Sequence, residues 1–358
     1  MLKLKDTDRH VVDSITDLLE SAGGLDRVRR LQAGPKSFDR AAWAKLAQHG
    51  WLGAAVPEAQ GGVGLGTREL LLLLEEAGRR LMPEPLVLAL AASRVLAGCG
   101  ETGAALLAEL IGGQTMVVPV ESEAGAALTE RGGSLDGATA YVADGHAGDV
   151  FLVLIEDGHA AAIVTVPRDT PGVTLESEDT VDGGTITRLR FRGMKISDLR
   201  VLAMGSQATA AFHAARDLSL LGYSALLVGL MDEALAMTVQ YLKDRKQFGV
   251  PIGSFQALQH RAASLYVIIK SSRALLYEAA RAGAERRRIA ALAAKSYASE
   301  SAMTTVKECV ALHGAIGYTA EYKMSLYFRR AMALAVAGGD AVACRKRLHA
   351  ERERSQGN

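Results

Sequence analysis

The sequence has few cysteines, no excess of charge of either sign and no long apolar run. Its three cysteines, Cys99, Cys309 and Cys344, lie far apart and lack the spacing of metal ligands. We therefore expect no metal site and reduced thiols that pack in a core. The 41 basic and 40 acidic residues leave a net charge of +1, which argues against binding of nucleic acid through bulk charge.

Signals for secretion and for membrane insertion are also lacking. The N-terminus is charged from its first residues and has no apolar core of a signal peptide. Apolar runs such as Leu70–Leu74 are interrupted by charges, here Glu75 and Glu76, so no segment is expected to span a bilayer. With 49% apolar and 23% charged residues over 358 positions, the composition predicts a folded, cytoplasmic protein.

Three zones that differ in their pattern of apolar and turn-forming residues follow one another along the chain. In residues 1–112, helical spacing of apolar residues (Trp43, Leu46) alternates with short loops, among them a glycine-rich turn at residues 61–66. Residues 113–205 hold β-prone runs at 115–120, 150–155, 161–166 and 185–191, separated by Gly, Asp and Pro. Residues 206–358 hold long helical stretches, and residues 209–246 contain no proline.

This order of helical, β-prone and again helical patterns predicts an α+β fold in three domains. An N-terminal helical domain takes residues 1–112 and a small middle antiparallel β domain takes residues 113–205. A C-terminal four-helix-type bundle takes residues 206–358, because long helices in sequence usually pack side by side. Asp39 is placed to cap the helix that contains Trp43.

Three sequence segments, in this order, carry a resemblance to a known family. Residues 43–58 read WAKLAQHGWLGAAVPE, residues 244–260 read DRKQFGVPIGSFQALQH, and residues 312–322 read LHGAIGYTAEY. Together they resemble the signatures of the acyl-CoA dehydrogenase family, whose domains also follow in the order α, β, α. The resemblance covers almost the whole chain, and the second segment carries it most strongly.

The resemblance implies an FAD-dependent dehydrogenation that introduces an α,β double bond into an acyl-CoA thioester. In this family a carboxylate removes the α-proton while the β-hydrogen leaves as hydride to the flavin. Members are usually tetramers, in which a neighbouring subunit holds part of the ADP end of each FAD. An electron-transfer flavoprotein is the usual electron acceptor.

Six residues match family positions that contact a neighbour's FAD. Arg245, Phe248 and Gln256 match the positions that reach across the interface, and Arg245 would contact the pyrophosphate, which suits a planar guanidinium. Three further residues match the loop that approaches the same ADP group: His313, Gly314 and Ala315. One departure is Ala311, where the family usually has a glutamine.

Segments that would hold the chain's own flavin and substrate have changed. The family segment Thr-Glu-Pro-x-Ala-Gly-Ser-Asp reads VESEAGAA at residues 120–127, so both hydroxyl residues are replaced by apolar ones. The Trp-Ile-Thr motif that lies against the flavin ring reads YVA at residues 141–143, so its threonine donor is missing as well.

The catalytic base is also missing. Aligned from Arg329, the usual Tyr-Glu-Gly-Thr motif reads AGGD at residues 337–340, which places Gly338 where the glutamate stands. Members that take the base from the long helix would have it at Ser219, counted back from Phe248. Asp340 is the only carboxylate near the lost glutamate, and its simpler interpretation is a capping or phosphate-side polar residue.

Three hypotheses account for this uneven pattern. In the first, the chain is the base-less subunit of a heteromeric acyl-CoA dehydrogenase, paired with a larger homologous subunit and contributing to the partner's FAD site. In the second, the chain is a self-sufficient enzyme that uses Asp340 as its base. In the third, it is a structural or regulatory homologue without flavin. The flavin content and the native mass distinguish the three.

Overall fold

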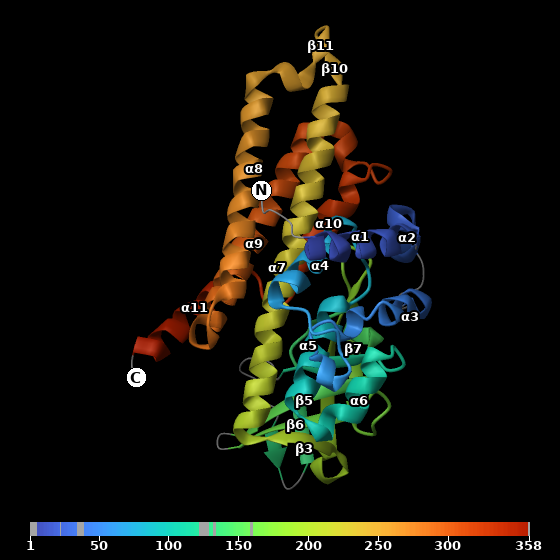
Figure 1. The fold of residues 1–358 in the computed structure, drawn as a ribbon, viewed down its shortest axis with the longest axis vertical. Helices are drawn as coiled ribbons and strands as arrows, with labels where there is room; N and C mark the ends of the chain where they lie inside the picture. The colour runs from blue at the N-terminus through green and yellow to red at the C-terminus, as the bar shows by residue number, and fades with distance from the viewer. Residues whose placement is uncertain are drawn as a thin grey trace. The chain divides into compact units, whose positions relative to one another are not determined.

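The computed structural model describes residues 6–21, 23–33, 39–121, 129–131, 134–157 and 160–356. Helices come first, strands follow, and long helices complete the chain (Figure 1). This order confirms the predicted α+β fold with a helical N-terminal part, a small β part and a C-terminal helical bundle. The bounds predicted for the three domains stay a prediction. The two compact units of the structure are described below.

The N-terminal part consists of short helices joined by tight turns. The α-helices are α1 (Asp6–Ser21), α2 (Gly24–Ala33), α3 (Arg40–Gln48), α4 (Thr67–Arg79), α5 (Leu86–Gly98) and α6 (Glu101–Ile111), with 3₁₀ turns η1 (Trp51–Gly53) and η2 (Glu58–Gln60). The predicted cap is confirmed, since the carboxylate of Asp39 accepts hydrogen bonds from the backbone N–H groups of Ala41 and Ala42. The glycine-rich residues 61–66 form a turn, as predicted.

The middle part contains more strands than the sequence indicated. They are β1 (Val117–Val120), β2 (Thr129–Arg131), β3 (Ser134–Ala138), β4 (Val142–Ala143), β5 (Val150–Asp157), β6 (Ala160–Pro167), β7 (Val173–Asp179), β8 (Thr185–Lys195) and β9 (Arg200–Met204), with 3₁₀ turns η3 (Gly145–Ala147) and η4 (Ile196–Asp198). The four predicted runs correspond to β1, β5, β6 and β8. Of the other strands, β2 and β4 have only three and two residues, β3 contains a glycine and β7 is largely polar, so the expected apolar pattern is weak in them. Strand β9 was also not predicted, although four of its five residues are apolar.

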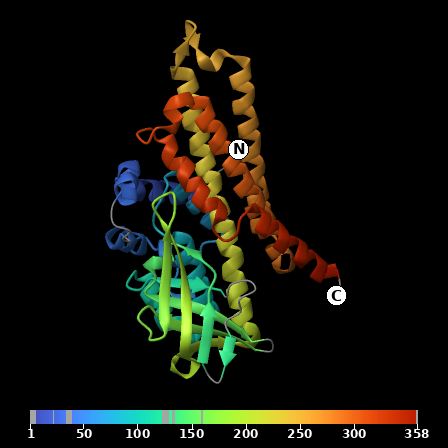
Figure 2. The ribbon, with the colours of Figure 1, turned by 180° about the vertical axis from the view of Figure 1, so that it is seen from behind.

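The strands form two sheets, which are visible from behind in Figure 2. One has the order β1-β5-β6-β9, and the other has the order β2-β3-β8-β4 with β7 also paired to β8. The pairs are antiparallel as predicted, except that β1 runs parallel to β5. That exception corrects the prediction of a purely antiparallel domain. It arises because residues 121–149 separate β1 from β5, which is enough chain for a crossover.

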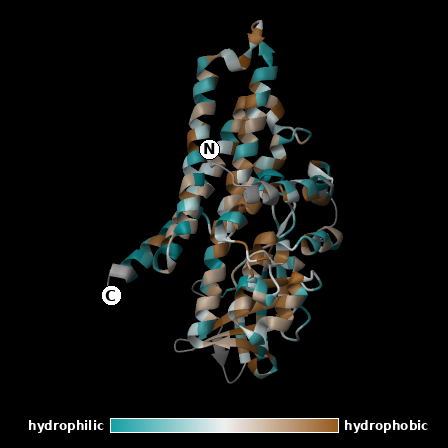
Figure 3. Cartoon of the chain, viewed as in Figure 1, coloured by the Kyte–Doolittle hydropathy of each residue, from teal (hydrophilic) through white to brown (hydrophobic). Residues whose placement is uncertain are grey.

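The C-terminal part begins with the longest helix. Its elements are α7 (Gly205–Asp244), β10 (Lys246–Gln247), β11 (Val250–Pro251), η5 (Ile252–Ser254), α8 (Gln256–Arg281), α9 (Ala284–His313), η6 (Gly314–Tyr318), α10 (Met324–Val336) and α11 (Ala341–Gln356). Helix α9 packs against α8, α10 and α11. The last helix, α11, is largely hydrophilic (Figure 3).

Helix α7 corrects the expectation that no segment could span a bilayer. By length and composition, α7 is long and apolar enough to do so. However, 78% of its most apolar 18-residue segment is buried inside the protein. The core helices of soluble proteins can be equally long and apolar. The length and apolar composition of α7 are therefore those of a long helix that is mostly buried in the protein.

The described residues form two compact units. The first unit comprises Met1–Ala33, Thr67–Pro83 and Leu220–Asn358, and the second comprises Gly34–Gly66 and Glu84–Ser219. The first unit therefore combines α1, α2 and α4 with most of the C-terminal helices. The second unit contains both sheets together with α3, α5, α6 and the first part of α7.

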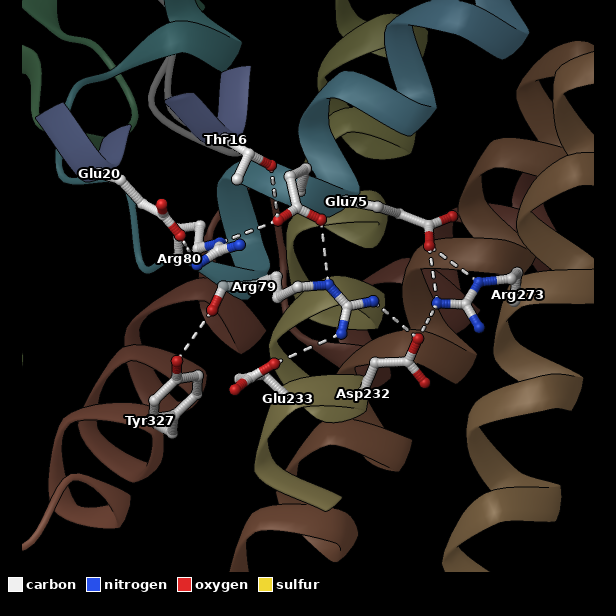
Figure 4. A network of polar contacts seen from close by, with 10 residues as sticks. Thr16, Glu20, Glu75, Arg79, Arg80, Asp232, Glu233, Arg273 and Tyr327 are labelled. Carbon is white, nitrogen blue, oxygen red and sulfur yellow. Dashed lines mark hydrogen bonds and ion pairs between the residues drawn. The ribbon is translucent and has the colours of Figure 1, made fainter. Parts of the chain in front are cut away.

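A network of charged side chains connects α4, α7 and α8 inside the first unit (Figure 4). Arg273 of α8 donates to Glu75 of α4 at 2.8 Å and to Asp232 of α7 at 2.5 Å. Asp232 also accepts a hydrogen bond from Arg79 at 3.0 Å, and Arg79 pairs with Glu76 at 3.0 Å. Because each carboxylate of this half-buried cluster faces a guanidinium, the network aligns the helices that carry the site described next.

Candidate functional site

The strongest sequence motif, residues 244–260, folds into a short hairpin between two long helices. Strands β10 and β11 pair antiparallel, with Lys246 opposite Pro251. At the turn, Phe248 has φ +54° and its side chain is 92% exposed. Its ring lies edge-on to that of Phe255, with 6.3 Å between the ring centres. A positive φ is uncommon for a residue other than glycine, and here it accompanies an aromatic ring held in solvent.

Two polar residues of the same segment are exposed and unengaged. Arg245 lies at the base of the hairpin and Gln256 is the first residue of α8. Neither side chain makes a hydrogen bond or an ion pair within the described part of the chain. A guanidinium without a carboxylate partner keeps its five donors available for an anion such as a phosphate.

The end of α9 supplies the other three predicted residues. Helix α9 ends at His313, and Gly314 then adopts φ +65°, which starts the turn η6. Gly314 and Ala315 are exposed, whereas His313 is buried, with 2% of its surface exposed. The His313 ring packs against Tyr241 of α7, with 4.6 Å between the ring centres. This contact brings the end of α9 close to the base of the Arg245 hairpin.

At the expected position of the catalytic glutamate, the chain has a glycine and therefore no side chain. Gly338 lies between α10 and α11 and has φ +72°, and Gly339 has φ +114°. A Cβ atom added to Gly338 would lie 3.3 Å from the Tyr223 ring and 3.5 Å from the Leu220 side chain. The backbone conformation and these neighbours together favour glycine at this position.

Two cations hold the backbone of this α10–α11 loop. Lys295 of α9 is fully buried and donates to the carbonyl oxygens of Ala335 at 3.0 Å and Gly339 at 3.1 Å. Burial lowers the pKa of Lys295 to about 8. Arg347 of α11 donates to the carbonyl oxygen of Gly338 at 3.2 Å. Sequence reasoning missed Lys295, although a single lysine in the apolar stretch at residues 290–298 was a usable signal.

The other two candidate positions are Asp340 and Ser219, and both side chains are engaged in local hydrogen bonds. Asp340 is exposed, and its carboxylate accepts a hydrogen bond from the backbone N–H of Ala343 at 2.7 Å, which caps α11. Ser219 donates its hydroxyl to the carbonyl oxygen of Ala215 at 3.1 Å, within its own helix. Among the residues that the structure describes, no group of three or more His, Cys, Asp or Glu side chains could hold a metal ion.

In the second unit, the segment expected near the chain's own flavin ring is tied to neighbouring side chains. The Tyr141 hydroxyl donates to Glu178 at 3.1 Å, and the Arg188 guanidinium lies 4.8 Å from the Tyr141 ring centre. Glu176 pairs with Arg190 at 2.5 Å and with Arg188 at 2.7 Å, and these bonds lower the pKa of Glu176 to about 2. The charged side chains named here are therefore paired with one another on this sheet.

The segment at residues 120–127 is described only in part. Residues 122–127 lie outside the described residues, so the replacements there stay predictions. Val120 ends β1, and the carboxylate of Glu121 pairs with Arg216 of α7 at 3.0 Å. Glu121 is thus engaged by a cation within the second unit.

Comparison with protein families gives two matches that together cover most of the chain. The family model described as acyl-CoA dehydrogenase, N-terminal domain matches residues 6–105. The model described as acyl-CoA dehydrogenase, C-terminal domain matches residues 208–350.

Individual proteins are similar over nearly the full length. Acyl-CoA dehydrogenase FadE27 of Mycobacterium tuberculosis is 30% identical in an alignment of 361 positions, which covers 95% of this chain and 95% of the relative. A chain of the ChsE4–ChsE5 complex from Mycobacterium tuberculosis superposes with a TM-score of 0.88 at 27% identity and 98% coverage of both chains. A chain of a Tcur3481–Tcur3483 steroid ACAD variant superposes with a TM-score of 0.87 at 29% identity and 99% coverage of both.

Proposed function

Because the chain belongs to the acyl-CoA dehydrogenase family, whose members depend on FAD, we propose that it is the subunit without a catalytic base in a heteromeric enzyme of this family. The assembly introduces an α,β double bond into an acyl-CoA thioester. A larger homologous subunit supplies the glutamate and the acyl pocket. This chain contributes in trans to the site that holds the ADP end of the partner's FAD, and an electron-transfer flavoprotein accepts the electrons.

The observation that carries the proposal is a contrast within the first unit. Gly338 provides no carboxylate at the position where the family has its base, and Asp340 of the same loop caps α11. Lys295 and Arg347 hold the backbone of that loop in place. The Arg245 hairpin, in contrast, keeps its motif and is exposed. A chain that had simply lost its function would have no reason to retain an exposed cation and an exposed aromatic ring at the position that serves a neighbour.

The exposed residues fit the phosphate end of a dinucleotide cofactor. Arg245 would bind the pyrophosphate through its guanidinium, and Phe248 would cover an apolar face of the ligand. Gly314 and Ala315 carry little or no side chain, so their backbone would approach the ligand closely. When bound, FAD supplies the acceptor for the hydride that leaves the β-carbon. This chain's residues bind and orient that cofactor from outside the reacting centre.

The same fit is poor for the ring end of a flavin bound by this chain itself. Tyr141 is already hydrogen-bonded to Glu178 and covered by Arg188. The similar ChsE4–ChsE5 structure is named as a complex of two proteins, and the Tcur3481–Tcur3483 structure is also named after two. These relatives support a partner subunit for this chain as well.

Substitution of Arg245 tests the trans contribution. In a complex purified after co-expression with the partner subunit, we expect Arg245→Ala to raise the Kd for FAD about 10- to 100-fold, because a charge-assisted bond to phosphate is lost. Arg245→Lys should recover only part of the affinity, since an ammonium group cannot bind two phosphate oxygens in the fixed geometry of a guanidinium. Flavin fluorescence during titration of the apo complex measures both.

Lys243→Ala is the matched control, because Lys243 is exposed on the last turn of α7 but is not part of the predicted site. It should leave the Kd unchanged. An unchanged Kd for Arg245→Ala in an intact complex would contradict the proposed role in trans.

A further inference from the structure

His313 differs from the other predicted site residues because it is buried. Its ring lies between two tyrosines from different segments, with 4.6 Å between its centre and that of Tyr241 and 5.0 Å between its centre and that of Tyr322. Tyr241 belongs to the last turns of α7, and Tyr322 lies after η6. A ring with 2% of its surface exposed cannot present either nitrogen to a ligand in solvent.

The hydrogen bonding of His313 defines its tautomer. Nδ1 lies 2.7 Å from the carbonyl oxygen of Cys309, one turn earlier in α9. Since a carbonyl oxygen only accepts, Nδ1 must carry the hydrogen and Nε2 is left with a lone pair. Nε2 is buried and has no hydrogen-bond partner within the described residues. Burial lowers the pKa of His313, which favours the neutral ring.

Tyr241 connects this ring to the exposed hairpin through the backbone. The carbonyl oxygen of Tyr241 accepts the N–H of Arg245 at 2.9 Å, and the carbonyl oxygen of Arg245 accepts the N–H of Ile252 at 2.8 Å. The second bond closes the base of the hairpin. A shift of the Tyr241 ring would therefore move the backbone that directs the Arg245 side chain.

On its other side, His313 precedes the exposed loop. Gly314 follows it directly and turns the chain with φ +65°. The loop folds back closely, since a Cβ added to Gly317 would lie 2.7 Å from the carbonyl oxygen of Val310 and 3.0 Å from Cβ of His313. The one buried ring thus contacts both segments that carry exposed site residues.

We infer that His313 is a positioning residue that holds the Arg245 hairpin and the Gly314–Ala315 loop in register with each other through ring contacts with Tyr241 and Tyr322. The inference rests on the proposed function for its purpose. It assigns His313 no contact with the cofactor, unlike the role that the sequence resemblance implies. The ring contacts, rather than the ring nitrogens, carry the effect.

Two substitutions separate the ring from its hydrogen bond. His313→Phe keeps an aromatic ring between the tyrosines and loses the donor, whereas His313→Asn keeps a donor for the Cys309 carbonyl and loses the ring. His49, which follows the last residue of α3, provides a matched control, because its Nδ1 also lies 2.8 Å from the carbonyl oxygen one turn earlier, that of Lys45, but the residue is exposed.

Hydrogen exchange of the chain alone tests the positioning without any cofactor. We expect His313→Asn to increase amide exchange over residues 241–256 by up to about tenfold, as for the loss of two aromatic contacts. His313→Phe and His49→Asn should leave exchange there within about threefold of the unmodified chain. Equal exchange in all variants, or equal loss of protection in His313→Phe and His313→Asn, would overturn the inference.

The FAD affinity of the complex with the partner subunit gives the second measurement. His313→Asn should raise the Kd for FAD about tenfold, with kcat unchanged at saturating FAD, and His313→Phe should stay close to the unmodified value. If Arg245→Ala weakens FAD binding and His313→Asn does not, the positioning role fails while the proposed function stands. If neither weakens it, the proposed function fails, and the exchange data alone decide whether His313 orders the hairpin.

Discussion

Lys295 shows how one buried charge is accommodated without a carboxylate partner. Its ammonium group donates to the Ser299 hydroxyl at 2.7 Å and to the carbonyl oxygens of Ala335 and Gly339. Ala335 lies in the last turn of α10, where carbonyl groups lack partners within the helix and the helix dipole favours a cation. All three donors are thus satisfied, but the charge remains removed from water, and this desolvation lowers its pKa to about 8.

Lys295 should consequently contribute stability that rises with pH in the alkaline range. Between pH 8 and about 10.5 the unfolded chain binds a proton at this lysine that the folded chain has released. The contribution of Lys295 to the free energy of unfolding should therefore increase across this window, by about 3 kcal/mol at most, and the charged form should cost the full amount below pH 8. Above pH 9 the thiols of Cys99 and Cys309, whose pKa values burial raises to about 11, act in the opposite direction, so the contribution of Lys295 is the difference between the unmodified chain and a variant without this lysine. Urea unfolding at a series of pH values measures the slope.

Lys295→Met should remove this rise, because methionine fills a similar volume and does not titrate. Lys243→Met, at an exposed position of α7, serves as its control and should retain the rise. If the Lys295→Met profile runs parallel to that of the unmodified chain, another group is responsible for the pH dependence.

Helices α4 and α7 cross within the first unit with their backbones in close contact. A Cβ added to Gly229 of α7 would lie 1.7 Å from the carbonyl oxygen of Glu75, and one added to Gly78 of α4 would lie 2.1 Å from the carbonyl oxygen of Leu226. Each helix therefore places a glycine against the backbone of the other. This contact brings Glu75 and Asp232 within reach of the same Arg273 guanidinium (Figure 4).

Gly229→Ala should separate the two helices and disturb the charged network. We expect a loss of roughly 3 kcal/mol or more in the stability of the first unit, since backbone atoms cannot move aside as a flexible side chain can. Gly283→Ala is the control, because a Cβ there meets nothing within 4 Å and the residue has φ −62°. Thermal unfolding followed by circular dichroism compares the two. Equal melting temperatures would show that the crossing tolerates a methyl group.

For the whole molecule, the ratio of FAD to protein chains distinguishes the proposed heteromeric enzyme from its alternatives. The proposed function predicts a colourless chain when it is expressed alone. Co-expression with the larger homologous subunit should give a yellow heterotetramer with about one FAD for every two chains. Absorbance at the flavin band together with native mass spectrometry measures both quantities.

The alternatives give different results in the same experiment. A lone chain with one FAD per protomer and turnover of an acyl-CoA would favour a self-sufficient enzyme, although Asp340 caps α11 in this structure. A chain that stays colourless with each candidate partner would favour a homologue without flavin.

Sequence reasoning was most successful where the signal is local. The cap formed by Asp39, the turn at residues 61–66 and the unbroken helices α7 and α9 follow from neighbouring residues, and the structure contains all of them. It was least successful for β2 and β4, because strands of two or three residues acquire their stability from the strands beside them. The parallel pairing of β1 with β5 likewise depends on residues far apart in the chain.

The sequence by itself determined the family, the order of helices and strands, and the absence of a glutamate at Gly338, because motifs and helical periodicity are written in contiguous residues. Only the tertiary structure decided which of the predicted site residues face solvent. It exposes Arg245, Phe248 and Gln256 and buries His313 between Tyr241 and Tyr322. The physical reason is that burial depends on what distant segments pack against a side chain, and no local pattern encodes those neighbours.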